Sequence, residues 1–269
     1  MSWPFETSEA LVTPEQIWEH HRSATGISRE DDLLPPLMVA TFQRLAFGRL
    51  CERAGATPQV GGHGGSGFVG ERAVGTLGGH PIVVQRITVG APAAALVMEG
   101  AIVRGVRTLI VVGSAGSLQP SLPIGSTVVV EASEREDGTS HHYLPVGEVV
   151  TADPELTRRL YVRAMERGIR PVQGRSWTID APYRETVGGI RRHWEAGVLV
   201  VEMEAAAMFA VARVRNIQVG LLVAVSDELY EVWRPGFTHP PYLEALVSAA
   251  DTAMDVASDL FRSEQPPTQ

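Results

Sequence analysis

The sequence is poor in cysteine and in basic charge, and it contains no long apolar run. Its one cysteine, Cys51, cannot close an internal disulfide, which predicts a small core residue in a reducing compartment. Aspartate and glutamate (31) outnumber lysine and arginine (23), and the net charge of −8 argues against sequence-independent binding of nucleic acid. No stretch approaches the roughly 20 apolar residues of a membrane helix. The first residues lack a secretion signal, so we expect a cytoplasmic protein without nucleic-acid or membrane partners.

Apolar runs alternate with helical segments along most of the chain. Such alternation predicts an α/β fold, here a single three-layer domain with a central mixed β-sheet flanked by helices. We expect this domain to span residues 35–262, after an N-terminal helical extension over 1–34 and before a disordered tail over 263–269. A glycine-rich loop is expected at 61–67, strands at 37–41, 82–85, 108–112, 127–132, 198–201 and 219–225, and helices at 14–22, 44–54, 91–104, 154–167, 205–214 and 241–260.

Three polar segments follow expected strands, at the sheet edge where ligands bind in such folds. The first, Gly113-Ser114-Ala115-Gly116, is expected to break the strand 108–112. Glycines let a backbone approach a ligand closely, and successive N–H groups can bind an anion. The segment equally suits a plain tight turn, which is the interpretation it favours when taken alone.

The second segment, Glu202-Met203-Glu204, lies between a buried strand and an alanine-rich helix. Two acids at the end of a core strand are costly unless they are paired, so packing does not explain them. A carboxylate accepts two hydrogen bonds at once and is therefore suited to grip two neighbouring hydroxyls. The alternative is that both acids cap the following helix through its dipole.

The third segment, Ser226-Asp227, follows the strand 219–225. A partly desolvated carboxyl group at this edge can have a raised pKa and act as a general acid. A helix cap or a turn is the competing interpretation. Elsewhere, the pair His141-His142 has no further ligand at metal-binding spacing, so no metal is expected.

Together these segments resemble the nucleoside phosphorylase and nucleosidase superfamily, over roughly Leu37 to Leu260. The resemblance rests on residues 113–116, on Asp137-Gly138-Thr139-Ser140-His141-His142, on residues 201–205 and on residues 225–227, in matching order and spacing. It implies that 35–262 is a catalytic domain that cleaves a nucleoside with phosphate to give a base and a (deoxy)ribose 1-phosphate. It also implies that no cofactor is needed and that the chain forms a homo-oligomer, a dimer or a hexamer.

The resemblance also implies roles for single residues. Asp227 resembles the catalytic acid at the purine N7, beside Ser226, and Glu204 resembles the carboxylate that holds the ribose 2′- and 3′-hydroxyls. Met203 is expected under the sugar, and Glu202 either at the base or in support of the helix start. The other implied site residues are Thr88 near the sugar, Arg184 near the base, and Gly113, Ser114, Arg44 and Arg86 at the phosphate or nucleophilic water.

The chain departs from the phosphorylase pattern around the phosphate. Val111 stands where an arginine usually precedes the glycine segment, and of the usual Gly-Asp-Pro-x-Arg stretch only Arg44 is kept, with Arg86 as an extra cation. The binding free energy of a phosphate dianion weakens by about 1.5–3 kcal/mol for each charged hydrogen bond that is missing. Two alternatives therefore stay open: a hydrolase that uses water, and a non-catalytic nucleoside-binding protein. Purine and pyrimidine bases are both open.

Overall fold

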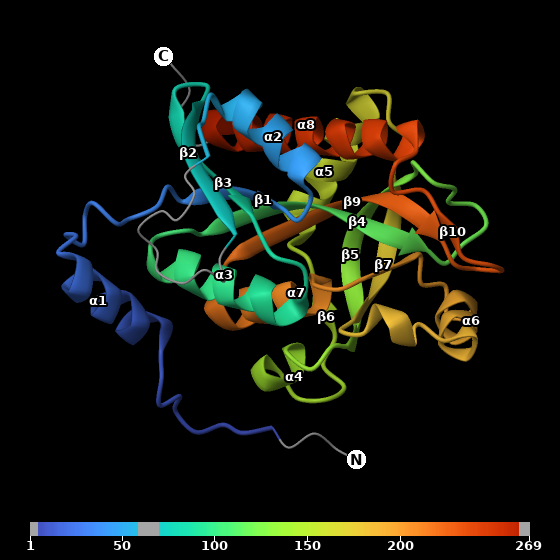
Figure 1. Ribbon diagram of the computed structural model, residues 1–269, viewed down its shortest axis with the longest axis horizontal. Coiled ribbons are helices and arrows are strands. Elements are labelled where there is room, and N and C mark those ends of the chain that lie inside the picture. The colour runs from blue at the N-terminus through green and yellow to red at the C-terminus, as the bar shows by residue number, and fades with distance from the viewer. Residues whose placement is uncertain (1–4, 59–69, 264–269) are drawn as a thin grey trace.

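A mixed β-sheet runs through the protein, and helices cover both of its faces (Figure 1). The computed structural model describes residues 5–58 and 70–263, so the glycine-rich loop expected at 61–67 lies outside the described residues. The predicted α/β fold, a single three-layer domain, is confirmed. The described strands are β1 (Leu37–Thr41), β2 (Glu71–Leu77), β3 (His80–Arg86), β4 (Thr108–Ser117), β5 (Thr127–Glu136), β6 (Val150–Thr151), β7 (Val172–Ile179), β8 (Val200–Glu202), β9 (Gln218–Glu228) and β10 (Arg234–Pro235).

The sheet closes on itself around its longest strands. Its order is β10-β9-β5-β7-β8-β4-β1-β3-β2, and β9 pairs with β4 as well as with β5. Strands β4 and β9 run parallel, with Thr108 opposite Gln218 at their start. Both are buried over most of their length, which explains why the sequence of each strand is a nearly continuous apolar run.

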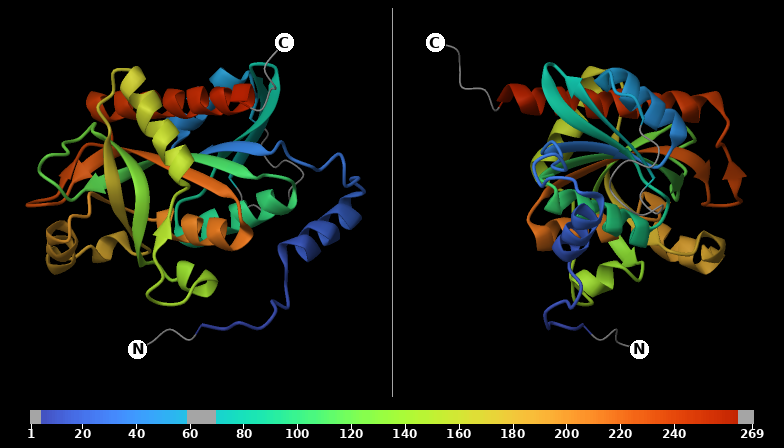
Figure 2. Two further views of the ribbon diagram at one scale, coloured as in Figure 1. Left: turned by 180° about the vertical axis from the view of Figure 1, so that it is seen from behind. Right: turned by 60° about the vertical axis from the view of Figure 1, so that its left-hand side comes forward.

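Two helical layers enclose the sheet. The first layer consists of α2 (Arg44–Ala54), α5 (Pro154–Glu166) and α8 (Pro240–Ser263), and the opposite face carries α3 (Ala91–Val103) and α7 (Ala205–Arg215), as Figure 2 shows from behind. Helices α3 and α7 are rich in buried alanine, and small side chains let a helix pack closely against a sheet. Two short helices, α4 (Ser140–Tyr143) and α6 (Val187–Glu195), and a 3-10 turn over Pro182–Arg184 follow strands β5 and β7.

Most expected elements are present within a few residues of their predicted bounds, but two strand ends were wrong. The segment Gly113–Gly116 does not break β4, because these residues continue the pairing with β9, and Gly116 also pairs with Val201 of β8. Ser226 and Asp227 likewise lie inside β9 rather than after it. The prediction also lacked β2, β7 and α6, and Ser263, which it assigned to the tail, still belongs to α8. Residues 264–269 lie outside the described part.

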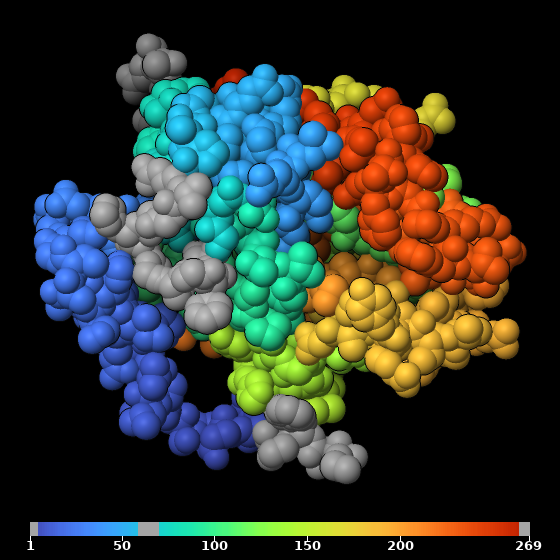
Figure 3. All heavy atoms as spheres, in the orientation of Figure 1, coloured from blue at the N-terminus to red at the C-terminus, as the bar shows by residue number. Residues whose placement is uncertain are grey.

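The N-terminal segment is joined to the end of α3 through Asp32, which also holds the buried Trp18. Helix α1 (Pro14–Thr25) begins with a capping box between Thr13 and Gln16. The indole Nε1 of Trp18 donates to Asp32 Oδ2 at 2.6 Å, and Asp32 also bonds the buried Arg104 guanidinium. In Figure 3 the chain before α1 stands away from the body, with an open gap between the two. Within the described ranges, no helix is both long and apolar enough to cross a membrane.

An ion-pair network joins the helices of the first layer. The buried Asp251 of α8 accepts from Arg49 Nε at 2.8 Å and from Arg53 at 2.9 Å, both on α2, and from Arg167 at 3.2 Å. Burial acts to raise the pKa of Asp251, but the hydrogen bonds from Arg49 and Arg53 outweigh it and hold the pKa below its usual value.

We predict that Asp251→Ala lowers the free energy of unfolding by about 2 kcal/mol, because hydrogen bonds to charged groups contribute about 1.5–3 kcal/mol. A lowered folded-state pKa gives stability that is present above the unfolded pKa and is lost as pH falls. The deficit should therefore be full at pH 7 and smaller near pH 3, as measured by urea unfolding. Glu244→Ala, an exposed acid on the same helix, is the control; equal effects of the two variants would contradict the network.

Candidate active site

A β-bulge shapes the edge of the sheet where β4 and β9 end. Ala115 lies opposite Val225 but Gly116 lies opposite Asp227, so Ser226 is an extra residue on β9. A Cβ added to Gly116 would come within 2.3 Å of Leu229 Cδ1 and 3.4 Å of Asp227 Oδ2. Glycine at 116 therefore permits the close approach that brings Asp227 beside β4.

A pocket of about 730 Å³ opens at this edge. Its floor comes from Ser114–Gly116 of β4, from Val201–Glu204 and from Ser226-Asp227 of β9. Its walls come from the residues that precede α2 and α3, from the Pro182–Ile190 segment and from the residues around β10. Figure 3 looks onto this hollow between blue α2, green α3, the gold α6 segment and the orange-red β10 segment.

Two donors fix the carboxylate of Asp227. Ser226 Oγ donates to Oδ1 at 2.7 Å, and Trp233 Nε1 donates to Oδ2 at 2.9 Å. Trp233 reaches Asp227 because β10 turns back onto β9, with Pro235 opposite Asp227. A carboxylate has about four acceptor sites, so the oriented group keeps capacity for a ligand.

Glu202 is held by protein donors on both oxygens. Its Oε1 accepts from the hydroxyls of Thr178 and Ser176 (3.1 Å for Ser176), and its Oε2 accepts from the backbone N–H of Glu204 at 2.7 Å and of Ala205 at 2.6 Å. The last two groups open the first turn of α7, whose N–H groups have no partner within the helix. Glu202 thus bonds the start of α7, while its predicted role at the base stays a prediction.

Glu204 has far fewer partners, although it is equally buried. Its Oε1 accepts from the N–H of Gly90, at the start of α3, at 2.6 Å. Gly90 has φ +113°, a conformation that residues with a Cβ rarely adopt. Burial, and then the charge of Glu202, raise the pKa of Glu204 to about 8. The Glu204 carboxyl group is thus placed in the pocket with acceptor capacity left over.

Ser114 bonds an aromatic hydroxyl from the other layer. Its Oγ lies 2.6 Å from the hydroxyl of Tyr242, in the first turn of α8. Burial raises the pKa of Tyr242, so the phenol keeps its proton. The Ser114 hydroxyl in the pocket lining is therefore backed by a neutral phenol.

Comparison with known proteins places this pocket in a family. Residues 40–262 match the model of the phosphorylase superfamily. The chain belongs to the phosphorylase superfamily. It is 28% identical over 166 residues to a uridine phosphorylase of Haemophilus influenzae, and 29% identical over 153 residues to a DeoD-type purine nucleoside phosphorylase of Caldanaerobacter subterraneus subsp. tengcongensis. Each alignment covers 56% of this chain and 66% of the relative, just under two thirds of the relative's length.

Solved structures show the same superfamily fold over nearly the whole chain. A purine nucleoside phosphorylase from Toxoplasma gondii, crystallised with immucillin-H, superposes with a TM-score of 0.76 at 18% identity. That match covers 97% of this chain and 100% of the other. A uridine phosphorylase from Vibrio fischeri reaches a TM-score of 0.74 at 19% identity, covering 88% of this chain and 95% of the other.

Six of the site residues predicted from the sequence line this pocket, and five lie outside its lining. Thr88 and Arg44 are exposed, and Arg184 is exposed on the 3-10 turn. Arg86 is bound by Glu71, its neighbour on β2. Gly113 lies one residue before the lining, inside β4. The residues brought together are Ser114, Glu202, Met203, Glu204, Ser226 and Asp227.

The lining carries charge of one sign. Among the described residues it contains the carboxyl groups of Glu185, Glu202, Glu204, Asp227 and Glu231, and no lysine, arginine or histidine side chain. Val111, where the pattern usually has arginine, is fully buried in the core. The described lining thus lacks the basic side chains that the phosphorylase pattern usually has around the phosphate, in agreement with the departure seen in the sequence.

Three lining or supporting residues were missed by the sequence analysis: Trp233, Tyr242 and Glu185. Tyr242 lies 128 residues from its partner Ser114, so no local pattern connects them. Trp233 is six residues after Asp227, and its ring is aimed back only because β10 pairs with β9. Glu185 directly follows Arg184, which the resemblance placed near the base.

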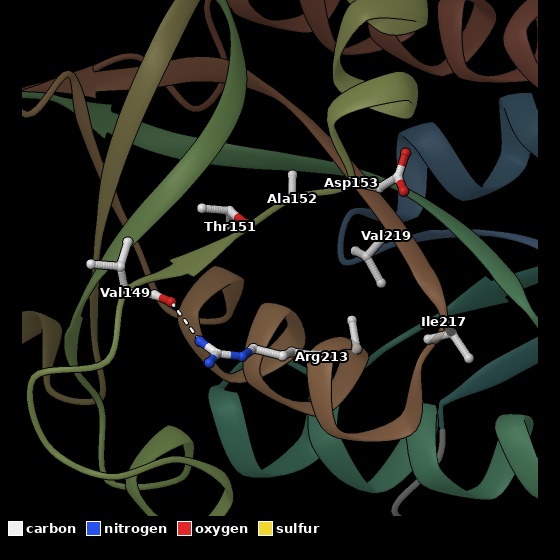
Figure 4. A pocket seen from close by; sticks show the side chains of 8 residues that line it. Val149, Thr151, Ala152, Asp153, Arg213, Ile217 and Val219 are labelled. Carbon is white, nitrogen blue, oxygen red and sulfur yellow. Dashed lines mark hydrogen bonds between the residues drawn. The ribbon is translucent and has the colours of Figure 1, made fainter.

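A second cavity, of about 360 Å³, lies between β6, β9 and α7 (Figure 4). Its charged side chains already have partners in the protein. Arg213 donates to the carbonyl of Val149 at 3.2 Å and lies 3.0 Å from Glu148, and Asp153 caps α5 through Leu156 N at 2.8 Å. The pocket of about 730 Å³, unlike this cavity, contains carboxyl groups with acceptor sites left for a ligand, and it is therefore the candidate active site.

We predict that Glu204→Gln makes the protein less sensitive to alkaline pH. A carboxyl group whose pKa is raised on folding contributes stability that is present at low pH and lost as pH rises through the folded value, here about 8. The difference in the free energy of unfolding, variant minus wild type, should therefore be more positive at pH 9 than at pH 6. A difference between the two proteins that does not change with pH would refute the assignment of the raised pKa to Glu204.

Proposed function

We propose that the protein is a nucleoside phosphorylase. It would cleave the N-glycosidic bond of a nucleoside with inorganic phosphate and release a base and a (deoxy)ribose 1-phosphate, without a cofactor. The observation that carries the proposal is the convergence of Glu204, Met203, Asp227 and Ser114 on one pocket of a phosphorylase-superfamily member. The uridine and purine nucleoside phosphorylases among its relatives support the same reaction.

Glu204 would position the sugar. One of its oxygens accepts from Gly90 N–H, which leaves the remaining acceptor sites for the ribose 2′- and 3′-hydroxyls. Met203, next in the lining, would pack against the apolar face of the sugar ring. Because Glu202 anchors the backbone N–H of Glu204, this carboxylate is held in place before a ligand arrives, which reduces the entropic cost of reaction.

Asp227 would act on the base. As the bond to C1′ lengthens, electron density moves onto the leaving base, and a carboxyl group at N7 can donate a proton or a hydrogen bond to it. Ser226 and Trp233 keep the group at one orientation. The nucleophile would approach the opposite face of the sugar from the Ser114–Tyr242 side.

A hydrolase is a second candidate, favoured by one specific observation. The described lining holds carboxyl groups and no basic side chain, which suits a neutral water better than a phosphate dianion. Phosphorolysis would require a cation from outside this lining, such as Arg44 or Arg86. The cytoplasmic location and the homo-oligomer stay predictions from the sequence.

The two candidates differ in their need for phosphate. Free base should be released from nucleosides in phosphate buffer and not in a phosphate-free buffer of equal ionic strength, with sugar 1-phosphate as the second product. Release at the same rate without phosphate would establish the hydrolase. If no base were released from any purine or pyrimidine nucleoside, both enzymatic functions would be refuted, and a non-catalytic nucleoside-binding protein would be the remaining alternative.

We predict that Asp227→Asn lowers kcat about 10²- to 10⁴-fold with little change in KM, because general acid catalysis typically contributes that factor. Steady-state base release measures both constants. Asp31→Asn, an exposed acid of the N-terminal segment, is the matched control and should keep wild-type rates. Wild-type turnover in Asp227→Asn would remove the acid role.

We predict that Glu204→Ala removes most of the discrimination between ribonucleosides and 2′-deoxyribonucleosides. Above pH 8, where Glu204 is ionised, each hydrogen bond to its charged carboxylate contributes about 1.5–3 kcal/mol, or roughly 10- to 100-fold in kcat/KM. The ratio of kcat/KM for a riboside and its 2′-deoxyriboside should fall by about that factor. An unchanged ratio would mean that Glu204 does not hold the 2′-hydroxyl.

A further inference from the structure

A buried tyrosine outside the pocket lining bonds a serine inside it. Ser114 lines the pocket, whereas Tyr242 is 5% exposed and packs in the apolar cluster under α2, α5 and α8. Their hydroxyl oxygens lie 2.6 Å apart, and among the described residues neither hydroxyl has another hydrogen-bond partner. The direction of the Ser114 hydroxyl in the pocket therefore depends on a side chain behind it.

The alternation of side chains along β4 explains why Ser114 faces α8. Successive side chains of a strand point to opposite faces of a sheet. Val112 lies in the cluster under α8, whereas Val111 and Ala115 lie in the cluster under α3 and α7. Ser114 shares the face of Val112, so its hydroxyl borders an apolar layer, where an unbonded polar group is costly. Tyr242 provides the partner that this hydroxyl needs.

The first turn of α8 is seated closely on the turn before β5. Gly125 in that turn has φ +90°, and its N–H donates to the carbonyl of Val225 at 3.0 Å. A Cβ added to Gly125 would come within 2.8 Å of Pro241 Cβ. Glycine at 125 therefore permits the close contact that places Tyr242, the neighbour of Pro241, against β4.

The phenol is the better donor of the pair. A phenolic O–H gives up its proton more readily than an aliphatic hydroxyl and donates a correspondingly stronger hydrogen bond. Burial raises the pKa of Tyr242, so its proton is present for this bond. With Tyr242 as the donor, Ser114 Oγ accepts, and the Ser114 proton is free to turn into the pocket. Hydrogen bonds in a chain polarise one another, which strengthens Ser114 as a donor.

Donors to a phosphate are scarce in the described lining, which holds no lysine, arginine or histidine side chain. Gln43 lines the pocket where β1 ends beside β4, with Thr41 opposite Val112. A phosphate dianion at this edge would be bound largely by neutral groups, so the direction of each hydroxyl proton affects its affinity. A hydroxyl that rotates freely can present a lone pair instead, which repels an anion.

We propose that Tyr242 is a positioning residue for phosphate: its hydroxyl donates to Ser114 Oγ and thereby turns the Ser114 proton toward a phosphate oxygen. This role rests on the proposed phosphorolysis, in which the nucleophile approaches from the side of Ser114. Tyr242 itself stays outside the lining and acts through the serine.

A double-mutant cycle separates positioning through Ser114 from a general structural effect. Calorimetric titration with inorganic phosphate would give Kd for the wild type, Tyr242→Phe, Ser114→Ala and the double variant. Tyr161→Phe, a partly buried tyrosine packed against the same apolar cluster, is the matched control and should behave as the wild type. Steady-state base release would give the KM for phosphate and the KM for the nucleoside separately.

Tyr242→Phe should raise the Kd and the KM for phosphate about 5-fold, and Ser114→Ala about 10-fold or more, with the KM for the nucleoside unchanged. The double variant should match Ser114→Ala, because Tyr242 acts only through that hydroxyl.

Two sets of outcomes distinguish the positioning role from the reaction itself. Phosphate-dependent base release together with wild-type phosphate affinity in Tyr242→Phe, additive effects in the double variant, or equal increases in both KM values would overturn the positioning role alone. A wild type that binds no phosphate would overturn it as well. Phosphate binding that depends on Tyr242 in a protein that releases no base would refute the phosphorylase alone.

Discussion

The buried carboxylate of Glu202 is the interaction on which the site depends. It joins three elements, because it accepts from Ser176 and Thr178 of β7, ends β8 itself, and receives the first N–H groups of α7. Thr178 in turn accepts from Ala206 N at 2.9 Å, which closes the network. A carboxylate taken out of water is costly unless donors surround it. The donors that satisfy Glu202 also determine where the next acid, Glu204, lies.

The two neighbouring acids are thereby given different tasks. Glu202 has most of its acceptor sites filled by the protein, whereas Glu204 keeps acceptor capacity beyond its hydrogen bond from Gly90 N–H, and burial and then the charge of Glu202 raise its pKa. On the other side of the pocket, the bulge at Ser226 turns Asp227 toward β4 and lets Trp233 and Ser226 hold it. Rigid strands and a helix start, rather than loops, therefore support the groups that would contact sugar and base.

The sequence was sufficient for the fold class and for locating three of the acids that line the pocket, Glu202, Glu204 and Asp227, because both depend on local pattern. Glu202 and Glu204 stood out as charges at the end of an apolar run, and the alternation of elements predicted the sheet. The glycines at 113–116 were misjudged as a turn, since a glycine in a buried strand can serve close approach instead, as Gly116 does against Leu229. Contacts across long sequence separations, such as Ser114 with Tyr242, carry no local signal.

The cations expected at the phosphate also show where inference from the sequence falls short. The sequence singled out Arg44 and Arg86 by resemblance, but Arg44 is exposed on α2 and Arg86 is bound by Glu71.

A crystal structure with a bound C-nucleoside would show whether Glu204 and Asp227 hold the two halves of one nucleoside. The ribose hydroxyls should lie on the Glu204 carboxylate and the base edge at Asp227. A nucleoside bound elsewhere, or in the pocket with its sugar away from Glu204, would contradict it.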